Sequence, residues 1–198
     1  MAKSTTATKA SARKRRADAD RSIASILDAA LDALANDPDS SMSEIARRAG
    51  VVRATIYVHF PTRTALLDAV MEYAVGLVVE SMRGAEPQRG EPVEALERVL
   101  RATWRQLGQF HGPLALNIAR LSAEELHRRH RPMLDQLEPL IERGQKKGVF
   151  RRDLPVAWHL AVLRAIVHAA STEIRAGRIS ESEAEAAMLT TAVSAVAE

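Results

Sequence analysis

The chain of 198 residues contains no cysteine, few aromatic residues and no long apolar run. Without cysteine, a disulfide, a thiolate zinc site and a cysteine nucleophile are all excluded. Aromatic residues make up only 4% of the chain, whereas alanine is abundant, and this composition favours helices over a β-sandwich or barrel. Because no stretch of about 18 apolar residues occurs, we expect no membrane span and a soluble, cytoplasmic protein.

Positive charge is concentrated near the N-terminus. Residues 1–64 hold 11 lysine and arginine residues against 7 aspartate and glutamate residues, whereas residues 65–198 hold 17 against 18. The polar segment 1–17 is predicted to be a disordered arm, and it carries the cluster Arg13-Lys14-Arg15-Arg16. A basic arm indicates an anionic partner, nucleic acid before a membrane surface, and a solvated tail is the alternative interpretation.

The spacing of apolar residues predicts an all-α fold of about nine helices. The first helix ends at Asn36-Asp37-Pro38-Asp39, because proline cannot continue the helical hydrogen bonds. A short helix begins after Ser41, which has the capping-box spacing to a glutamate three residues on, and Gly50 suits the left-handed position that closes it. A second short helix is expected over residues 53–59.

A loop rich in glycine and proline, residues 84–92, is the predicted domain boundary. Beyond it we expect a short helix at 114–121, a new helical segment starting at Pro132 and a kink at Pro139. The predicted parts are a basic arm (1–17), a first domain (18–64), a connecting helix (65–84) and a second domain (93–198).

Two short helices joined by a glycine-containing turn indicate a helix-turn-helix, in which the second helix enters the major groove of DNA. Ile56 and Phe60, four residues apart, are expected to face the core of this unit. The remaining side of the same helix is polar and is expected to face outward; it carries Arg53, Thr55, Tyr57 and His59.

The same region resembles the signature of the TetR family of transcriptional repressors. The matching residues are Glu44-Ile45-Ala46, Ala49-Gly50-Val51, Thr55-Ile56-Tyr57-Val58-His59-Phe60 and Leu66-Leu67-Asp68-Ala69-Val70. The resemblance implies a three-helix DNA-binding domain, a larger helical ligand-binding domain and a dimer formed by the last two long helices. It also implies that a small molecule releases the protein from its operator DNA.

By position, the resemblance implies that Thr55, Tyr57 and His59 contact DNA, the last two mainly at phosphates, and that Arg63 meets phosphate. Arg53 is the one long, forked donor near the start of the recognition helix, so we expect it to read a base. Val52 lies where the family often has a capping serine, and valine cannot cap. The predicted DNA-binding residues are Arg53, Ala54, Thr55, Tyr57, Val58, His59 and Arg63.

The second domain is larger than dimerisation requires, and a mainly apolar set of its residues is expected to line a cavity between helices. For each member, plain core packing is the alternative. The set favours a small, largely apolar effector and no cofactor. It consists of Trp104, Leu107, Phe110, His111, Leu114, Ile118, Leu137, Trp158, Val162 and His168.

The last two helices, within residues 154–177 and 180–197, are predicted to form a homodimer as an intermolecular four-helix bundle. Small residues, Ala170, Ala184 and Ala187, are expected to allow close approach. Two-fold symmetry then requires a roughly palindromic operator, because each subunit presents one recognition helix.

Two other classes of function are alternatives. Glu124, His127 and His130 lie three residues apart and could share a helix face as metal ligands of an enzyme. However, the chain has no His-Glu-x-x-His, glycine-rich phosphate loop or Gly-x-Ser-x-Gly motif, so neither a metal nor catalysis is predicted. A helical adaptor that binds a partner protein would not need the outward-facing polar set of residues 53–59.

Overall fold

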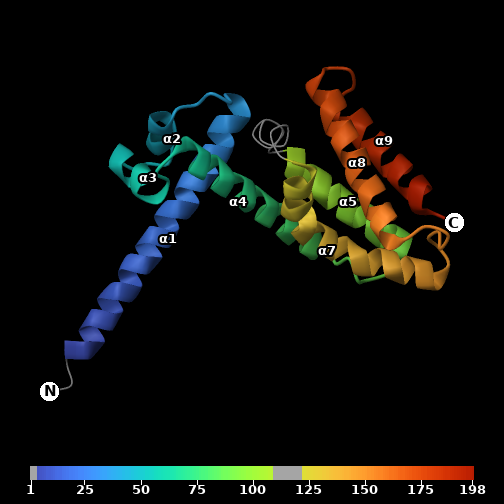
Figure 1. Cartoon of the computed structure of the whole chain (residues 1–198), viewed down its shortest axis with the longest axis horizontal. Coiled ribbons are helices and arrows are strands. Elements are labelled where there is room, and N and C mark those ends of the chain that lie inside the picture. Colours follow the sequence, from blue (N-terminus) through green and yellow to red (C-terminus); the bar gives the residue numbers. More distant parts are fainter. Residues whose placement is uncertain (1–3, 109–121) are drawn as a thin grey trace. The chain divides into compact units, whose positions relative to one another are not determined.

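The computed structural model describes residues 4–108 and 122–198, and that part of the chain is almost entirely helical (Figure 1). Its only β-type pairing is an isolated antiparallel bridge between Phe150 and Ala197. The prediction of an all-α fold is confirmed, while the helix predicted at 114–121 lies outside the described residues. No helix in the described ranges is long and apolar enough to cross a membrane. The helices are α1 (Ser4–Asn36), α2 (Met42–Arg48), α3 (Arg53–His59), α4 (Arg63–Gly84), α5 (Pro92–Gly108), α7 (Ala123–Lys147), α8 (Val156–Arg175) and α9 (Glu181–Val196).

The chain forms two compact units, residues 1–73 and 74–198, which divide within α4 rather than at the predicted 84–92 boundary. The physical reason is that α4 contributes to two cores. Leu66 and Val70 are buried in its first half, whereas Val78 and Met82 belong to the core of the second unit. The loop at 84–92 therefore lies inside the second unit.

The α1 helix begins at Ser4, so the structure differs from the predicted disordered arm over residues 4–17. Alanine, lysine and arginine in this segment are good helix formers. They also continue a helix whose later turns bury Ile26, Ala30 and Leu34 completely or nearly so. Because those packed turns have already nucleated the helix, each added residue costs little.

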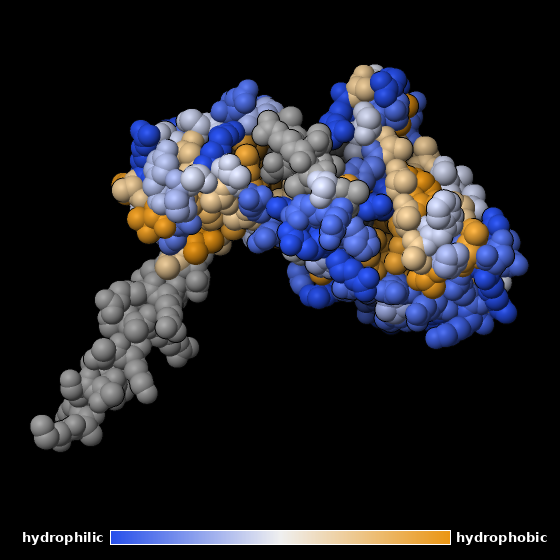
Figure 2. Space-filling view, in the orientation of Figure 1, coloured by the Kyte–Doolittle hydropathy of each residue, from blue (hydrophilic) through white to orange (hydrophobic). Residues whose placement is uncertain are grey.

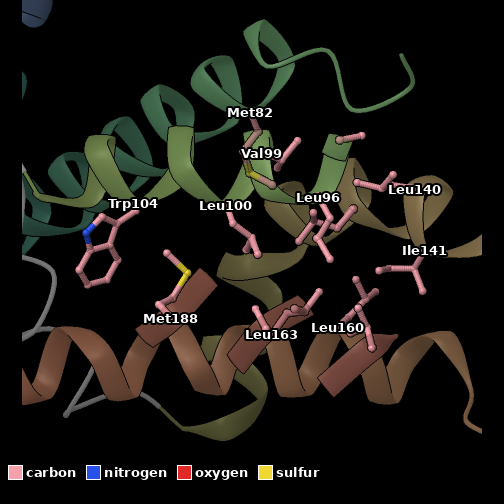
Figure 3. Close-up of a cluster of buried hydrophobic side chains, with 14 of the residues drawn as sticks. Met82, Leu96, Val99, Leu100, Trp104, Leu140, Ile141, Leu160, Leu163 and Met188 are labelled. Atoms are coloured by element: carbon pink, nitrogen blue, oxygen red, sulfur yellow. The ribbon is translucent and has the colours of Figure 1, made fainter. Parts of the chain in front are cut away.

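The second unit packs the end of α4 with α5, α7, α8 and α9 around one apolar core. Figure 3 shows Leu96 and Leu100 of α5 pointing toward Leu160 and Leu163 of α8. Met188 of α9 lies beside the ring of Trp104 in the same view. The core thus joins helices that are far apart in the sequence.

The α7 helix is continuous through Pro132 and Pro139, so the prediction that Pro132 starts a new segment is wrong. A proline removes one backbone N–H donor, but both prolines are exposed and clear of the core. The opposite side of α7 buries Leu140 and Ile141 completely, and this packing stabilises the helix across both interruptions.

The loop between α4 and α5 is fixed by two arginines of the second unit. Arg98 donates to the carbonyl oxygens of Ala85, Glu86 and Arg89, at 3.3, 3.2 and 2.7 Å. Arg143 of α7 donates to the carbonyl of Pro87 at 3.0 Å and to that of Gln88. The glycine and proline content that predicted a linker therefore belongs to an ordered turn.

Candidate nucleic-acid interface

The turn between α2 and α3 is built from local contacts that its sequence dictates. Ser41 caps α2 by accepting a hydrogen bond from the Glu44 N–H at 3.2 Å. Gly50 has a φ of 68°, a left-handed conformation that side chains disfavour. The Val51 N–H then donates to the Ala46 carbonyl at 3.0 Å, which closes the turn and starts the chain toward α3.

The α3 helix has one buried side and one exposed side, as the sequence predicts. Ile56 is fully buried and Phe60 is 7% exposed. Arg53, Ala54, Tyr57 and Val58 are exposed, whereas Thr55 and His59 are half-buried. The expectation of an outward polar face is therefore met in full by Arg53 and Tyr57, and in part by Thr55 and His59.

Two valines extend this exposed surface. Val58 is 77% exposed and Val52 is 70% exposed, and Figure 2 shows orange surface over α3. Val52 occupies the N-cap position of α3 without a side-chain cap, as its sequence position indicated. Apolar groups on the recognition helix can contact the methyl group of thymine in the major groove. The sequence position of Val52 indicates only a missing cap, and its exposure adds this residue to the candidate DNA-binding surface.

The Arg53 guanidinium is held over the ring of Tyr57, with 5.5 Å from its central carbon to the ring centre. A cation over an aromatic face is attracted by the ring quadrupole. This contact restricts a long side chain at the first residue of α3, where base edges are usually met. The contact therefore orients the Arg53 side chain on the exposed face of α3.

Arg63, the first residue of α4, makes contacts within the protein that the sequence did not indicate. One of its nitrogens donates to the Pro38 carbonyl at 2.7 Å and another to the Ser40 carbonyl. In the structure Arg63 therefore joins the start of α4 to the turn before α2. Its predicted role at phosphate remains a prediction.

Three further contacts fix the frame around the helix-turn-helix. Ser25 of α1 donates to the Ala49 carbonyl at 3.0 Å. Arg48 of α2 pairs with Asp32 of α1 at 2.8 Å. Tyr73 of α4 donates to Asp28 of α1 at 2.7 Å, and this hydrogen bond raises the pKa of the tyrosine. No periodicity in the sequence signals such pairs, because their members are 16 to 45 residues apart.

Glu44 of α2 faces two arginines of its own helix. Its carboxylate accepts hydrogen bonds from Arg47 and Arg48, which lower the pKa of Glu44 to about 2. The Ser41–Glu44 spacing thus gives a one-sided cap, because the glutamate side chain is used by the arginines. Both arginines are exposed, and they precede α3 by only a few residues in the sequence.

The predicted effector-binding set divides between core, surface and undescribed residues. Trp104, which is 1% exposed, and Leu137 are buried in the core. Leu107 is partly buried and packs against this core, and Val162 is half-buried. His168 is half-buried and faces His130, with ring centres 5.7 Å apart. Four members lie outside the described residues: Phe110, His111, Leu114 and Ile118.

Trp158 does not line the interior, which corrects its assignment to the cavity. It is 56% exposed, because the inward side of α8 is set by His159, Leu160 and Leu163. His159 is almost fully buried, and its Nε2 lies 3.1 Å from the Arg151 carbonyl. A residue one step before His159 is turned about 100° away from it around the helix.

The outer side of α8 and α9 carries small residues, and Figure 2 shows white-to-orange surface there. Ala165 and Ala187 are exposed on it. Ala170 and Ala184, which were expected to allow close approach between subunits, are buried in the core of their own chain instead. Their small size serves packing within the subunit.

The residues considered as metal ligands do not come together. Glu124 and His127 are exposed, while His130 turns toward the carbonyl of Leu126, 2.7 Å from its Nδ1. Among the described residues, no three histidine, aspartate or glutamate side chains form a group that could hold a metal ion.

A helix-turn-helix with an exposed cationic and aromatic recognition helix, joined by α4 to a larger helical unit, defines the class of DNA-binding transcription regulators. Residues 26–70 match the model of a protein family described as "Bacterial regulatory proteins, tetR family". The HTH-type transcriptional regulator NfxB of Pseudomonas aeruginosa is 28% identical over 156 residues, covering 76% of this chain and 81% of NfxB.

The HTH-type transcriptional repressor LfrR of Mycolicibacterium smegmatis is 37% identical over 81 residues, 41% of this chain and 43% of LfrR. The crystal structure of LfrR in complex with proflavine has a TM-score of 0.70 at 25% identity. The matched region covers 90% of this chain and 98% of the LfrR chain in that crystal structure. Residues 26–70 thus match the TetR family, and the similarity to NfxB and LfrR along the chain supports a ligand-responsive DNA-binding transcription regulator of that family.

Proposed function

We propose that the protein is a homodimeric repressor that binds a palindromic operator through α3 and is released by a small, largely apolar molecule. The observation that carries the DNA-binding role is the exposed face of α3, on which Arg53 is held over Tyr57. Arg53 is assigned to a base edge, and Tyr57 and His59 to phosphates. Ala54, Thr55 and Val58 complete the contacting surface.

The basic cluster near the N-terminus adds sequence-independent attraction to this surface. Removing residues 1–17 should therefore weaken binding to all duplexes about equally, because charge carries no base information. For each phosphate that the truncated protein no longer neutralises, the dependence of log affinity on log salt should fall by about 0.9. A truncation that changed only the preferred sequence would instead make this segment a reader of the minor groove.

The α4 helix is the proposed connection between effector and operator. It supplies Leu66 and Val70 to one core and Val78 and Met82 to the other, so the two packings share one element. The effector must prefer a conformation in which the two α3 helices of the dimer no longer match successive major grooves. The complex of LfrR with proflavine supports a small-molecule effector for this fold.

The deciding experiment is selection of genomic fragments by the purified protein, followed by footprinting of the selected duplexes. A protected palindrome with two half-sites one helical turn apart, or a multiple of it, is the expected result. Absence of any sequence preference at physiological salt would contradict the proposal and favour a helical adaptor. Effectors are then screened by operator release, with an expected coupling of about 5- to 150-fold.

A further inference from the structure

Two helices of the second unit bring imidazole and guanidinium groups together. His130 of α7 and His168 of α8 have ring centres 5.7 Å apart, with the rings tilted by 48°. Arg164 lies one helical turn before His168 on α8. All three side chains are half-buried. We call His130, His168 and Arg164 the α7–α8 cluster; none of them belongs to the DNA-binding surface.

The hydrogen bonding of His130 fixes which of its nitrogens remains available to a ligand. Its Nδ1 lies 2.7 Å from the carbonyl oxygen of Leu126. A carbonyl only accepts, so Nδ1 carries the hydrogen of the neutral ring. Nε2 is then an acceptor while the ring is neutral and becomes a donor when the ring is protonated. A bound anion would stabilise the protonated form of the ring by its negative charge.

The charges that act on the two rings are all positive. Burial is the main cause that lowers the pKa of both imidazoles. The pKa of His130 is lowered further by His168, Arg164 and His127, and that of His168 by Arg164 and Arg175. These groups come from α7 and α8, and no carboxylate is among them. The cluster therefore has cationic surroundings that disfavour a second positive charge.

Two acidic groups of neighbouring turns and helices have other partners. Glu125 of α7 accepts a hydrogen bond from Arg129 at 2.7 Å. Glu185 of α9 pairs with Arg101 of α5 at 3.5 Å. Within residues 4–108 and 122–198, Arg164 has no hydrogen bond or ion pair. A half-buried guanidinium beside two imidazoles, with no counter-charge in the described chain, is a site of the kind that an anion fills.

We propose that the α7–α8 cluster binds the carboxylate of an organic acid whose apolar body lies against the adjacent core. Arg164 supplies the permanent charge, and one imidazole supplies a second charged donor on taking up a proton. Since two like charges 5.7 Å apart repel, the pair takes one proton and suits a monoanion better than a phosphate dianion. Met133 and Val167, close to these residues in sequence, pack against the core.

This inference deepens the proposed function, because it gives the largely apolar effector an acidic end. It rests on the proposed function only for the claim that the bound acid releases operator DNA. No array of charges is apparent in the sequence of the second domain, because the three residues are spread over 39 positions and two helices.

The proposal has a definite pH dependence. The imidazoles of the free protein are neutral at pH 8, because burial and the neighbouring cations lower their pKa. A bound carboxylate favours the protonated ring and raises its pKa, so binding takes up a proton. Affinity must therefore rise as pH falls from 8 and level off below the pKa of the free imidazoles.

The test is calorimetric titration of the full chain at pH 6 and pH 8 with four probes: 1-naphthoate, 1-naphthamide, inorganic phosphate and zinc chloride. Naphthoate should bind more tightly at pH 6 with uptake of up to one proton, measured in buffers of different ionisation enthalpy. The neutral amide should bind at least about tenfold more weakly, since it lacks the charge-assisted hydrogen bonds. Phosphate and zinc should bind more weakly still.

Three variants separate the cluster from a general charge effect. Arg164→Met keeps an apolar stem of similar length and should weaken naphthoate by about tenfold or more. The double variant His130→Gln/His168→Gln keeps hydrogen-bonding side chains but should remove the proton uptake. Arg89→Met, in the α4–α5 turn, removes one exposed positive charge elsewhere and should leave naphthoate binding unchanged. Circular dichroism of each variant confirms folding.

Equal affinity for naphthoate and its amide, preference for phosphate or zinc, or unchanged binding in Arg164→Met would each overturn the proposal. Operator affinity with and without naphthoate is measured separately. If the acid binds with proton uptake but leaves operator affinity unchanged, the anion site stands and the coupling in the proposed function fails. If operator binding itself is absent, the titration without DNA still decides the anion site.

Discussion

At the scale of single residues, the contact between Arg53 and Tyr57 makes a prediction about base recognition. Arg53→Ala should relax the preference at one base pair of each half-site, worth about 1–3 kcal/mol of discrimination. Tyr57→Phe keeps a ring beneath the guanidinium but loses the hydroxyl, so affinity for all sequences should fall alike. Selection from randomised duplexes measures both. Uniformly weaker binding of Arg53→Ala with unchanged preference would reassign Arg53 to phosphate.

Two glycines within helices allow a matched test of packing. At Gly144 of α7, an added Cβ would lie 2.0 Å from the ring of Phe150, whereas at Gly76 of α4 it would meet nothing within 4 Å. Gly144→Ala should lower the free energy of unfolding by about 1–3 kcal/mol through overpacking. Gly76→Ala should raise it by about 0.5–1 kcal/mol, because alanine loses less backbone entropy. Urea denaturation followed by circular dichroism compares the two.

The same pair shows what sequence can and cannot supply at this scale. Both glycines lie within helices, and no pattern in the chain distinguishes them. Phe150, after the end of α7, folds back onto that helix, and only the three-dimensional contact makes Gly144 necessary. If Gly144→Ala were neutral, the Phe150 ring would have moved, and a Phe150→Leu background should then make no further difference.

At the scale of the elements, capping distinguishes α3 from its neighbours. Val52 has no side-chain hydrogen bond to α3, and it is 70% exposed. Val52→Ser should therefore raise the stability of the first unit by about 1 kcal/mol, since a hydroxyl can accept from the first turn and little apolar burial is lost. Val58→Ser is the control, because the same change at an exposed residue in the last turn of α3, away from the N-cap, should stay within about 0.5 kcal/mol. Equal effects of both variants would exclude capping as the cause.

Helix positions were predictable from sequence to a greater degree than helix contacts. Ser180 and Glu183 form the complete capping box that their spacing predicts, with hydrogen bonds in both directions. Ser41 and Glu44 have the same spacing, yet the glutamate turns to two arginines instead. Spacing thus locates the helix start, but competing charges on the helix decide which hydrogen bonds form. The exposed prolines of α7 were misjudged for a similar reason, because burial on the opposite side outweighed them.

At the scale of the whole molecule, the sharing of α4 between two cores was hidden from the sequence. Glycine and proline at 84–92 marked the most obvious loop, but Arg98 and Arg143 hold that loop by its carbonyl groups. Periodicity reports that α4 is buried along its length and not which unit buries it. For the same reason, Trp158 was assigned to an interior that its helix turns away from.

The homodimer is the last prediction, and the buried side of α8 and α9 decides how it must be tested. Leu163 and Met188 are 1% exposed, so glutamate at either position would unfold the chain rather than separate subunits. Ala165 and Ala187 are exposed on the outer side, where glutamate is tolerated in a monomer but adds charge to an apolar contact in a dimer.

Ala165→Glu and Ala187→Glu should therefore keep the helical circular dichroism of the wild type, give a monomer in light scattering, and bind the operator far more weakly. The loss of affinity follows because one monomer presents a single α3 to a two-fold site. Ala35→Glu, an exposed change at the end of α1, is the control and should remain dimeric. A wild-type monomer at micromolar concentration, or dimers that persist in both variants, would place the subunit contact outside the outer side of α8 and α9.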